Sequence, residues 1–499
     1  MTEGIGEFFE QHAESTDLGR QALRGGLISV AIQYGNAAFQ IIASIVLARL
    51  LSPEDFGLVA IVTVLTSFAP LLIDFGLGDA TAQRSTITQS QVSSLFWLST
   101  AIGLAVALVV AACSPLIASL YAEPRLQPIA LSIAITFVLS GMSIQHLALL
   151  RRTMQFGKIG RIQILGTLAG MVVAIAMALC GYGYWALVLR PITNSLFVAV
   201  GAWTACRWRP RHPVFDKDVS SMVRFGLNIV GFSVTYTLAK SADRLVLGLV
   251  YRPDQVGYYQ NAINLYENSI QMGLVQVHRV GSTALSKLQS NPAALRERYQ
   301  AGLSVVAYFV MPLASILSVT GKDLTVILLG EKWHAAGVLL SVIALKGIFH
   351  VIESSQGWLH LSIGTADRWQ KWGLVATPVL VGAVLAGLPF GPIGVAAAIV
   401  IACMLNSVPS VVYAGRPIGI DAALVIRTVY RQLIGAIATA AGGWWLQTTI
   451  LPDYPILARV VLAGCFCACI YLAVVVVVFR FVEPIRVIGS IVRDLLGRR

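Results

Sequence analysis

Long apolar runs recur along the whole chain, separated by short polar segments. A helix that spans a bilayer needs about 20 apolar residues, so windows of that length locate candidate spans. Hydrocarbon admits only helices or closed barrels, and these runs are too long for barrel strands. The pattern therefore predicts an all-α polytopic membrane protein of about fourteen transmembrane helices. The predicted spans lie near residues 27–49, 57–77, 93–113, 127–147, 162–181, 184–204, 225–250, 257–279, 300–319, 336–358, 372–390, 392–413, 430–450 and 458–480.

The composition agrees with this pattern. Hydrophobic residues make up 57% of the 499 positions and charged residues only 12%, with a mean hydropathy of +0.76. A soluble domain usually carries about twice that share of charge. The predicted spans leave only short loops, none long enough to fold as a separate domain. We therefore expect a membrane transporter rather than an enzyme, with no cofactor and no glycosyltransferase, kinase or protease head.

The net charge of +12 fits a membrane topology better than nucleic-acid binding. With the N-terminus placed in the cytoplasm, most Lys and Arg fall on cytoplasmic segments, as the positive-inside rule requires. This distribution predicts a bacterial inner-membrane protein with both termini cytoplasmic and with no nucleic-acid partner. The basic clusters are Arg151, Arg152, Lys158 and Arg161, then Arg207, Arg209, Arg211, Lys217 and Arg224, and finally the segment 480–499.

The two ends of the chain have different characters. Residues 1–19 are acidic and lack the basic start of a cleavable signal peptide, so the first span is expected to direct insertion. The C-terminal stretch places Ile485, Ile488, Val492 and Leu495 on one helical side with arginines elsewhere. That arrangement is typical of an interfacial helix.

The seven cysteines do not form a metal motif. Cys465, Cys467 and Cys469 lie within one predicted span at a spacing of two, which cannot converge from a single helix. We interpret them as small apolar packing residues and predict no metal site.

An internal repeat divides the chain. Shifting the sequence by 200 positions aligns residues 23–58 with 223–258 without a gap, and LLSPEDFG then faces VYRPDQVG. An offset of six spans predicts parallel repeats that enclose a central path. The predicted division is a cytoplasmic tail at 1–22, an N-lobe at 23–210, a C-lobe at 211–420, two further helices at 421–481 and a cytoplasmic amphipathic tail at 482–499.

Polar side chains form a stripe along the first span. Gln33, Asn36 and Gln40 recur at spacings of three and four, which places them on one helical face. In the seventh span the repeat places Lys240 and Arg244 on the matching face, and Asp243 follows Lys240 by three positions. The stripe is therefore retained between the lobes while its chemistry becomes cationic.

Further polar groups lie in the other spans. The cost of a charge at the bilayer centre, about 2.5 kcal/mol or more, favours groups that face a partner or water. Stripes on several helices therefore predict one polar cavity, although each group could instead pair between helices as packing contacts. These additional cavity candidates are Asn261, Asn264 and Glu267 in the eighth span, Lys346, His350 and Glu353 in the tenth, Arg190 in the sixth and Asp74 in the second.

His350 and Glu353 lie at a spacing suited to metal binding, but they supply only two ligands. We interpret them as part of the cavity wall. Lys240, Arg244 and Lys346 suit an anion such as a diphosphate. Because acidic residues accompany these cations, the predicted cavity is mixed in charge.

Several segments resemble the Wzx-type polysaccharide exporters. These segments are LARLLSPEDFGLVAI at 47–61, LLRRTMQFGKIG at 149–160, GYGYWALVLRP at 181–191, ADRLVLGLVYRPDQVGYYQNAINLYEN at 242–268, ALSKLQSNPAALRERY at 284–299 and LLGEKW at 328–333. The resemblance implies membership of the multidrug/oligosaccharidyl-lipid/polysaccharide exporter superfamily, with two six-helix lobes, two extra helices and alternating access.

The resemblance also implies a substrate, an undecaprenyl-diphosphate-linked sugar repeat unit that is flipped to the periplasmic leaflet for exopolysaccharide, capsule or O-antigen synthesis. A polysaccharide polymerase and a chain-length regulator are candidate partners, alongside membrane lipids. In that family, charges on the first, second, seventh and eighth spans serve transport. Carried over, this favours Asp74, Lys240, Asp243, Arg244 and Glu267, whereas the first span here has only neutral polar groups.

Three other functions remain open on the sequence alone. A cation-coupled multidrug antiporter of the same superfamily would share the lobes, but it should carry an acidic residue deep in the N-lobe, where Asp74 is the sole candidate. A flippase for the peptidoglycan lipid precursor is a second alternative. A membrane polymerase or ligase is a third, but it would need a substantial external loop, and the predicted outer loops are short.

Overall fold

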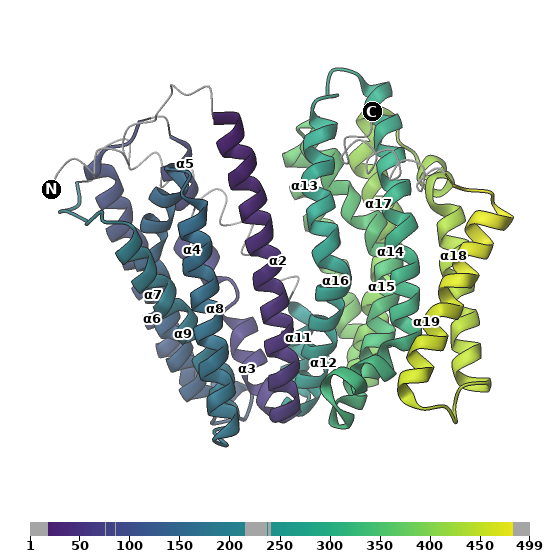
Figure 1. Ribbon diagram of the computed structural model, residues 1–499, viewed down its shortest axis with the longest axis horizontal. Coiled ribbons are helices and arrows are strands. Elements are labelled where there is room, and N and C mark those ends of the chain that lie inside the picture. Colours follow the sequence, from purple (N-terminus) through teal and green to yellow (C-terminus); the bar gives the residue numbers. More distant parts are fainter. Residues whose placement is uncertain (1–17, 75, 85, 215–236, 238–240, 483–499) are drawn as a thin grey trace. The chain divides into compact units, whose positions relative to one another are not determined.

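The computed structural model describes residues 18–74, 76–84, 86–214, 237 and 241–482. Within these residues the regular structure is helical, which confirms the predicted fold class (Figure 1). Nine stretches of the described chain are long and apolar enough to cross a membrane, so the predicted number of fourteen is not established. The chain forms two compact units, Met1–Gly257 (unit 1) and Tyr258–Arg499 (unit 2). The lobe boundaries expected from the repeat stay a prediction.

Unit 1 contains long helices packed in pairs. The pairs α6 with α7, α8 with α9 and α2 with α8 are in extensive contact, and the hydroxyl of Ser99 on α6 donates to the Gly141 carbonyl of α7 at 3.1 Å. The helices are α2 (Leu18–Leu50), α3 (Pro53–Leu65), α4 (Ala69–Asp74), α5 (Leu77–Gln83), α6 (Gln89–Leu120), α7 (Leu126–Arg152), α8 (Phe156–Leu179), α9 (Trp185–Ala205), α11 (Ala242–Val250) and the first turn of α12 (Pro253–Tyr266).

Unit 2 is built around α14 and α15, which contact each other more extensively than any other pair of helices in the described chain. Most of the remaining helices pack against one of these two. The elements are the rest of α12, a π-helical turn (Glu267–Gln271), α13 (Met272–Ser286), α14 (Pro292–Leu329), α15 (His334–Ile363), α16 (Ala366–Gly387), α17 (Gly391–Gly415), α18 (Ala422–Thr449) and α19 (Ile456–Leu472), which continues into a π-helical stretch (Ala473–Val478).

Local sequence sets several of the helix starts. Ser52 and Asp55 form a capping box, in which each side chain accepts the other residue's backbone N–H, and Pro53 takes the first helical position of α3. Thr88 and Gln91 do the same for α6. These caps satisfy backbone donors that hydrocarbon could not.

The predicted second span, 57–77, is not one straight helix. It is divided into α3, α4 and α5, with the first break after Leu65. The hydroxyls of Thr66 and Ser67 donate to the carbonyls of Val62 and Val64, each at 2.8 Å. Such side-chain bonds compete with the helical ladder and bend or end a helix. Most of the predicted seventh span lies outside the described residues.

The helices carry their apolar residues on the outside as well as inside. Leu108 is 61% exposed, Val172 66%, Leu374 68% and Val477 71%, and each lies within a membrane-length stretch. In water such side chains would be costly, but against lipid they are in their preferred solvent. The exposure of these side chains therefore fits the membrane class predicted from the sequence.

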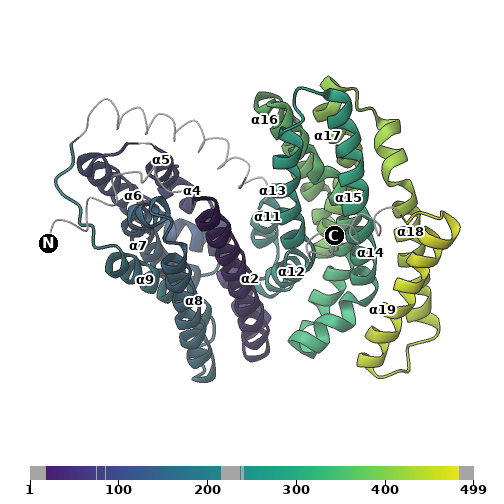
Figure 2. The same cartoon turned by 45° about the horizontal axis from the view of Figure 1, so that its top comes forward.

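Within unit 2, the last two helices are held to α14 by a buried carboxylate. In Figures 1 and 2, α18 and α19 lie side by side and next to α14. Asp323 of α14 is 3% exposed. Its carboxylate accepts from Arg459 of α19 at 2.7 Å and from Gln447 of α18 at 2.9 Å. Both carboxylate oxygens are thus bonded to the two helices that follow the predicted C-lobe.

Candidate functional site

The helix ends around residues 50 and 250 match in detail. α2 ends at Leu50 and α11 ends at Val250, and the next residue in each case donates its N–H to a carbonyl four positions back, at 2.8 Å. α3 then begins at Pro53 and α12 at Pro253. The register of 200 residues predicted for the repeat is therefore confirmed for these described residues.

These two equivalent turns also contact each other directly. A Cβ added to Gly57 would lie 1.7 Å from the Pro253 carbonyl oxygen, and one added to Gly257 would lie 1.9 Å from the Pro53 carbonyl oxygen. No side chain fits at either position without moving backbone. The aligned glycines are thus required by a reciprocal backbone contact between the first turns of α3 and α12.

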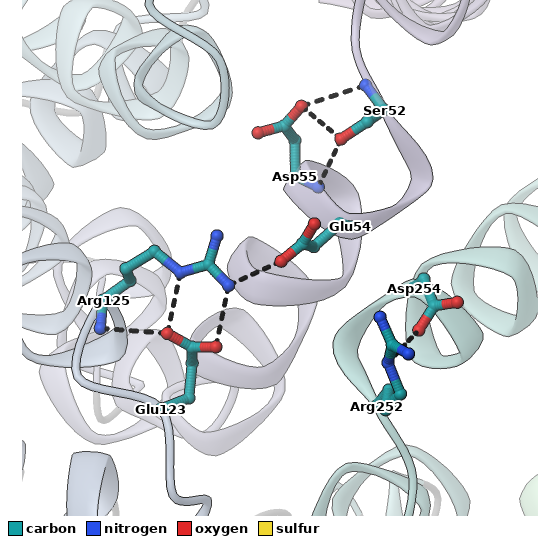
Figure 3. Close-up of polar contacts among 7 residues, drawn as sticks. All are labelled: Ser52, Glu54, Asp55, Glu123, Arg125, Arg252 and Asp254. Atoms are coloured by element: carbon teal, nitrogen blue, oxygen red, sulfur yellow. Dashed lines mark hydrogen bonds and ion pairs between the residues drawn. The ribbon is translucent and has the colours of Figure 1, made fainter.

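A network of charged groups surrounds the turn at residues 52–55 (Figure 3). Arg125, at the start of α7, donates to Glu123 at 2.7 and 2.8 Å and to Glu54 at 2.5 Å. The Arg125 guanidinium holds the pKa of the Glu123 carboxyl below its ordinary value, and the two carboxylates raise the pKa of Arg125. The network ties the loop between α6 and α7 to the first turn of α3.

The same loop also contacts α11. The Tyr121 hydroxyl donates to the Leu245 carbonyl at 3.3 Å, and its ring would lie 2.7 Å from a Cβ at Gly248. Burial raises the pKa of Tyr121 to about 12, so the phenol stays protonated at neutral pH and can donate. Figure 3 also shows Arg252 paired with Asp254, at 3.6 Å, at the start of α12.

The predicted charges of the seventh span are partly within the described chain. Asp243 is 8% exposed, and Arg244 Nε lies 3.5 Å from its carboxylate. The guanidinium of Arg244 also donates to the Ser241 hydroxyl at 3.2 Å. The pair lies in the first turn of α11, where Asp243 suits the positive end of the helix dipole. Lys240, the third member, lies outside the described residues.

The predicted residues of the tenth span do meet side chains from another helix. His350 Nδ1 and Glu353 Oε2 on α15 are 3.4 Å apart. The Cys403 thiol of α17 donates to the same Oε2 at 3.0 Å, and the Asn406 amide donates to Glu353 Oε1 at 2.8 Å. We call His350, Glu353, Cys403 and Asn406 the α15–α17 cluster. Lys346 lies one turn before His350, its carbonyl oxygen 4.0 Å from the Cys403 sulfur.

The other predicted cavity residues are spread over both units. In unit 1, Gln33 and Gln40 are exposed on α2, whereas Asn36 is half-buried with an Oδ1 that has no hydrogen-bond partner among the described residues. Asp74, the last residue of α4, accepts from the Gly78 N–H at 3.3 Å, and Arg190 is half-buried on α9.

In unit 2, Asn261 is 2% exposed, Asn264 accepts from Gln260 at 2.8 Å, and Glu267 begins the π-helical turn. π-helical turns inside helices often mark functional sites. That all these groups share one cavity stays a prediction.

The sequence interpretation missed several residues that the structure places in contact. Cys403 and Asn406 were not selected, although an asparagine three positions after a cysteine within an apolar span was a usable signal. Glu54, Glu123 and Arg125 were also missed, because charged residues in short loops carry no periodic pattern. Glu54 lies 71 residues from Arg125 along the chain, so no local spacing could reveal that contact.

The fold and these contacts define a polytopic helical membrane protein that holds charged and polar groups within and between its helices. Residues 46–337 match the model of the family described as polysaccharide biosynthesis protein, which covers more than half of the chain. The chain belongs to this family, and the resemblance predicted from the sequence is confirmed.

Named relatives agree with this assignment, and a solved structure has a similar fold. The chain is 26% identical over 396 residues to the lipopolysaccharide biosynthesis protein WzxC of Escherichia coli K12, with 78% of each chain covered. It is 24% identical over 418 residues to the succinoglycan biosynthesis transport protein ExoT of Rhizobium meliloti, covering 83% of this chain and 84% of that protein. Its fold is similar to that of the lipid II flippase MurJ, with a TM-score of 0.69, 14% identity, and coverage of 91% of this chain and 99% of MurJ.

Proposed function

We propose that this protein is a flippase that moves undecaprenyl-diphosphate-linked oligosaccharide repeat units from the cytoplasmic to the periplasmic leaflet of the inner membrane, for the synthesis of a surface polysaccharide. Membership of the polysaccharide biosynthesis family carries this proposal. The similarity to a protein named for succinoglycan transport supports it further.

Membrane helices with interior charges fit this task. The substrate joins a long apolar chain to a diphosphate and a sugar head group, and moving that head group through hydrocarbon would carry a large penalty. Helices that keep polar side chains away from lipid offer the head group a path. We assign Asp243 and Arg244 of α11 in unit 1 to contact with the head group, and we assign the same role separately to the α15–α17 cluster in unit 2. The polyprenyl chain would stay in lipid.

The topology follows from the basic residues. Both termini are assigned to the cytoplasm, because this orientation places the basic clusters at 151–161 and 207–224 on the cytoplasmic side. The loops at 50–56, 114–126 and 251–256 then face the periplasm, and the seven residues of Figure 3 all belong to that side. A polysaccharide polymerase and a chain-length regulator are the partner proteins this function implies.

The test is a flipping assay with the purified protein in vesicles. A fluorescent undecaprenyl-diphosphate-linked oligosaccharide is placed in both leaflets, and a membrane-impermeant quencher is added outside. Without flipping about half of the signal is protected, whereas an active flippase exposes nearly all of it. We expect wild-type protein to abolish the protected fraction.

Variants connect the activity to the charges. Arg244→Ala, alone or with Lys240→Ala, should slow flipping at least about tenfold, because a cation that can bind the diphosphate is lost. Arg298→Ala, an exposed arginine of α14, is the matched control and should flip normally. Wild-type vesicles that leave the protected fraction unchanged, or cells that instead gain drug resistance on expression, would favour the antiporter.

A further inference from the structure

A group of three metal-ligating side chains lies inside unit 2. His350 and Glu353 come from α15, and Cys403 comes from α17, a helix in extensive contact with α15. One ligand atom from each lies within 4.8 Å of the other two. In the sequence only His350 and Glu353 are close neighbours, and two ligands are too few for a metal site. The fold adds the third.

The two distances from Glu353 Oε2 to the other ligand atoms can be compared with those of a tetrahedral metal site, while the His350 and Cys403 ligand atoms lie within 4.8 Å of each other. With metal bonds of about 2.0 to 2.3 Å, nitrogen, oxygen and sulfur ligands lie roughly 3.4 to 3.6 Å from one another. The Nδ1 atom of His350 is 3.4 Å from Glu353 Oε2. The Cys403 sulfur is 3.0 Å from the same oxygen, so it would need to move by about half an ångström.

The surroundings hold the carboxylate in place for this role. Asn406 donates to Glu353 Oε1 at 2.8 Å, which leaves Oε2 directed toward His350 and Cys403. Partners of this kind orient metal ligands and tune their affinity. Tyr266 packs against α15 just before His350, where its ring would lie 3.6 Å from a Cβ at Gly347. Its buried hydroxyl has no hydrogen-bond partner among the described residues.

We propose that His350, Glu353 and Cys403 form a binding site for a divalent cation of the zinc class. One nitrogen, one carboxylate oxygen and one sulfur are a ligand set that zinc accepts, whereas calcium and magnesium prefer oxygen alone. Binding forms a metal–sulfur bond as the thiol loses its proton to solvent, and no electron is transferred.

The charges around the three ligands are compatible with binding of a divalent cation. With the metal, the thiolate and the Glu353 carboxylate offset the two positive charges, while His350 binds as neutral imidazole. Lys346, one turn away, adds a positive charge that lowers the affinity for a cation but can stabilise the thiolate. Since α15 and α17 contribute ligands together, the bound metal would link them. Metal binding at this site can be measured without any cargo, so its result is separate from that of the flipping assay.

Cobalt is the probe, because thiolate ligation gives a charge-transfer absorption that oxygen and nitrogen ligands lack. Chelator-treated full-length protein in detergent is titrated with Co²⁺ and then with Zn²⁺. We expect one Co²⁺ per chain with a thiolate charge-transfer band, loss of the band as Zn²⁺ displaces it, and a higher melting temperature with Zn²⁺.

Variants locate the site. Cys403→Ser keeps a hydroxyl that can donate to Glu353, so it should fold yet lose the band entirely, whereas Cys467→Ser, at a buried cysteine of α19, should keep it. Asn406→Ala should lower the Zn²⁺ affinity about 10- to 100-fold while retaining the band. A wild-type protein without the band, a band that persists in Cys403→Ser, or equal loss in Cys467→Ser would overturn the proposal.

Discussion

Asp323 and Glu353 are carboxylates held inside the same unit, but their partners differ in kind. Asp323 is bonded to a guanidinium that stays charged at any physiological pH and to an amide, and both of its oxygens are occupied. Glu353 is held by a thiol, an amide and an imidazole. The thiol can lose its proton, the imidazole can gain or lose one, and the amide can turn.

This difference separates a structural contact from a binding site. The pair of Asp323 with Arg459 joins α14 to α19 across 136 residues and offers no group for exchange. The α15–α17 cluster has exchangeable donors around one carboxylate oxygen. A buried charge by itself therefore does not indicate function, whereas the chemistry of its partners does.

The largest expected effect comes from breaking the Asp323 pair. Arg459→Met should lower the free energy of unfolding by about 3 to 5 kcal/mol, because it leaves a buried carboxylate without its cation. Thermal unfolding in detergent measures this loss. The double variant Asp323→Leu with Arg459→Leu removes both charges and should recover most of the stability. An Arg459→Met protein as stable as wild type would show that the pair is not structural.

The uncharged backbone contact between the first turns of α3 and α12 gives the next largest expected effect on stability. Gly57→Ala should destabilise by about 1 to 3 kcal/mol, since its methyl group would overlap the Pro253 carbonyl and force α3 and α12 apart. Gly257→Ala should cost a similar amount, because the contact is reciprocal. Gly35→Ala on α2 is the control, as nothing lies within 4 Å of its added Cβ. Equal melting temperatures for Gly57→Ala and Gly35→Ala would disprove the contact.

A substitution of Glu353 should change the stability less than Arg459→Met does. Glu353→Gln should alter the free energy of unfolding by about 1 kcal/mol or less, because Asn406 can turn its amide and the Cys403 thiol can still donate. The same variant should bind Zn²⁺ at least about tenfold more weakly, since a neutral amide is a poor metal ligand. Should it melt as early as Arg459→Met, the two carboxylates would not differ in role.

The smallest effect is expected at the exposed network of Figure 3. Arg125 and Glu54 are 41% and 45% exposed, so Arg125→Gln should cost less than about 1 kcal/mol, and less at high salt. The folded pKa of Glu123 lies below its ordinary value. Its contribution is therefore present above the ordinary pKa and is lost as pH falls through the lower folded one. Melting curves of wild type and Arg125→Gln should converge at acidic pH, and a constant gap would contradict this assignment.

The amino-acid sequence by itself determined what depends on one helix at a time. The lengths of the apolar runs indicated the membrane class, and the basic loops predicted the orientation. The repeat gave the register of Pro53 with Pro253. Helical periodicity also placed Lys346, His350 and Glu353 on one face, because the positions of side chains around a single helix follow from their spacing.

Only the tertiary structure decided which helices meet. The sulfur of Cys403 reaches Glu353 across 50 residues, and Arg459 reaches Asp323 across 136, because α17 packs on α15 and α19 on α14. Spacing along the chain contains no information about such distant contacts. Likewise, an apolar window cannot show that the second span breaks after Leu65, since that break comes from hydroxyls competing for backbone carbonyls.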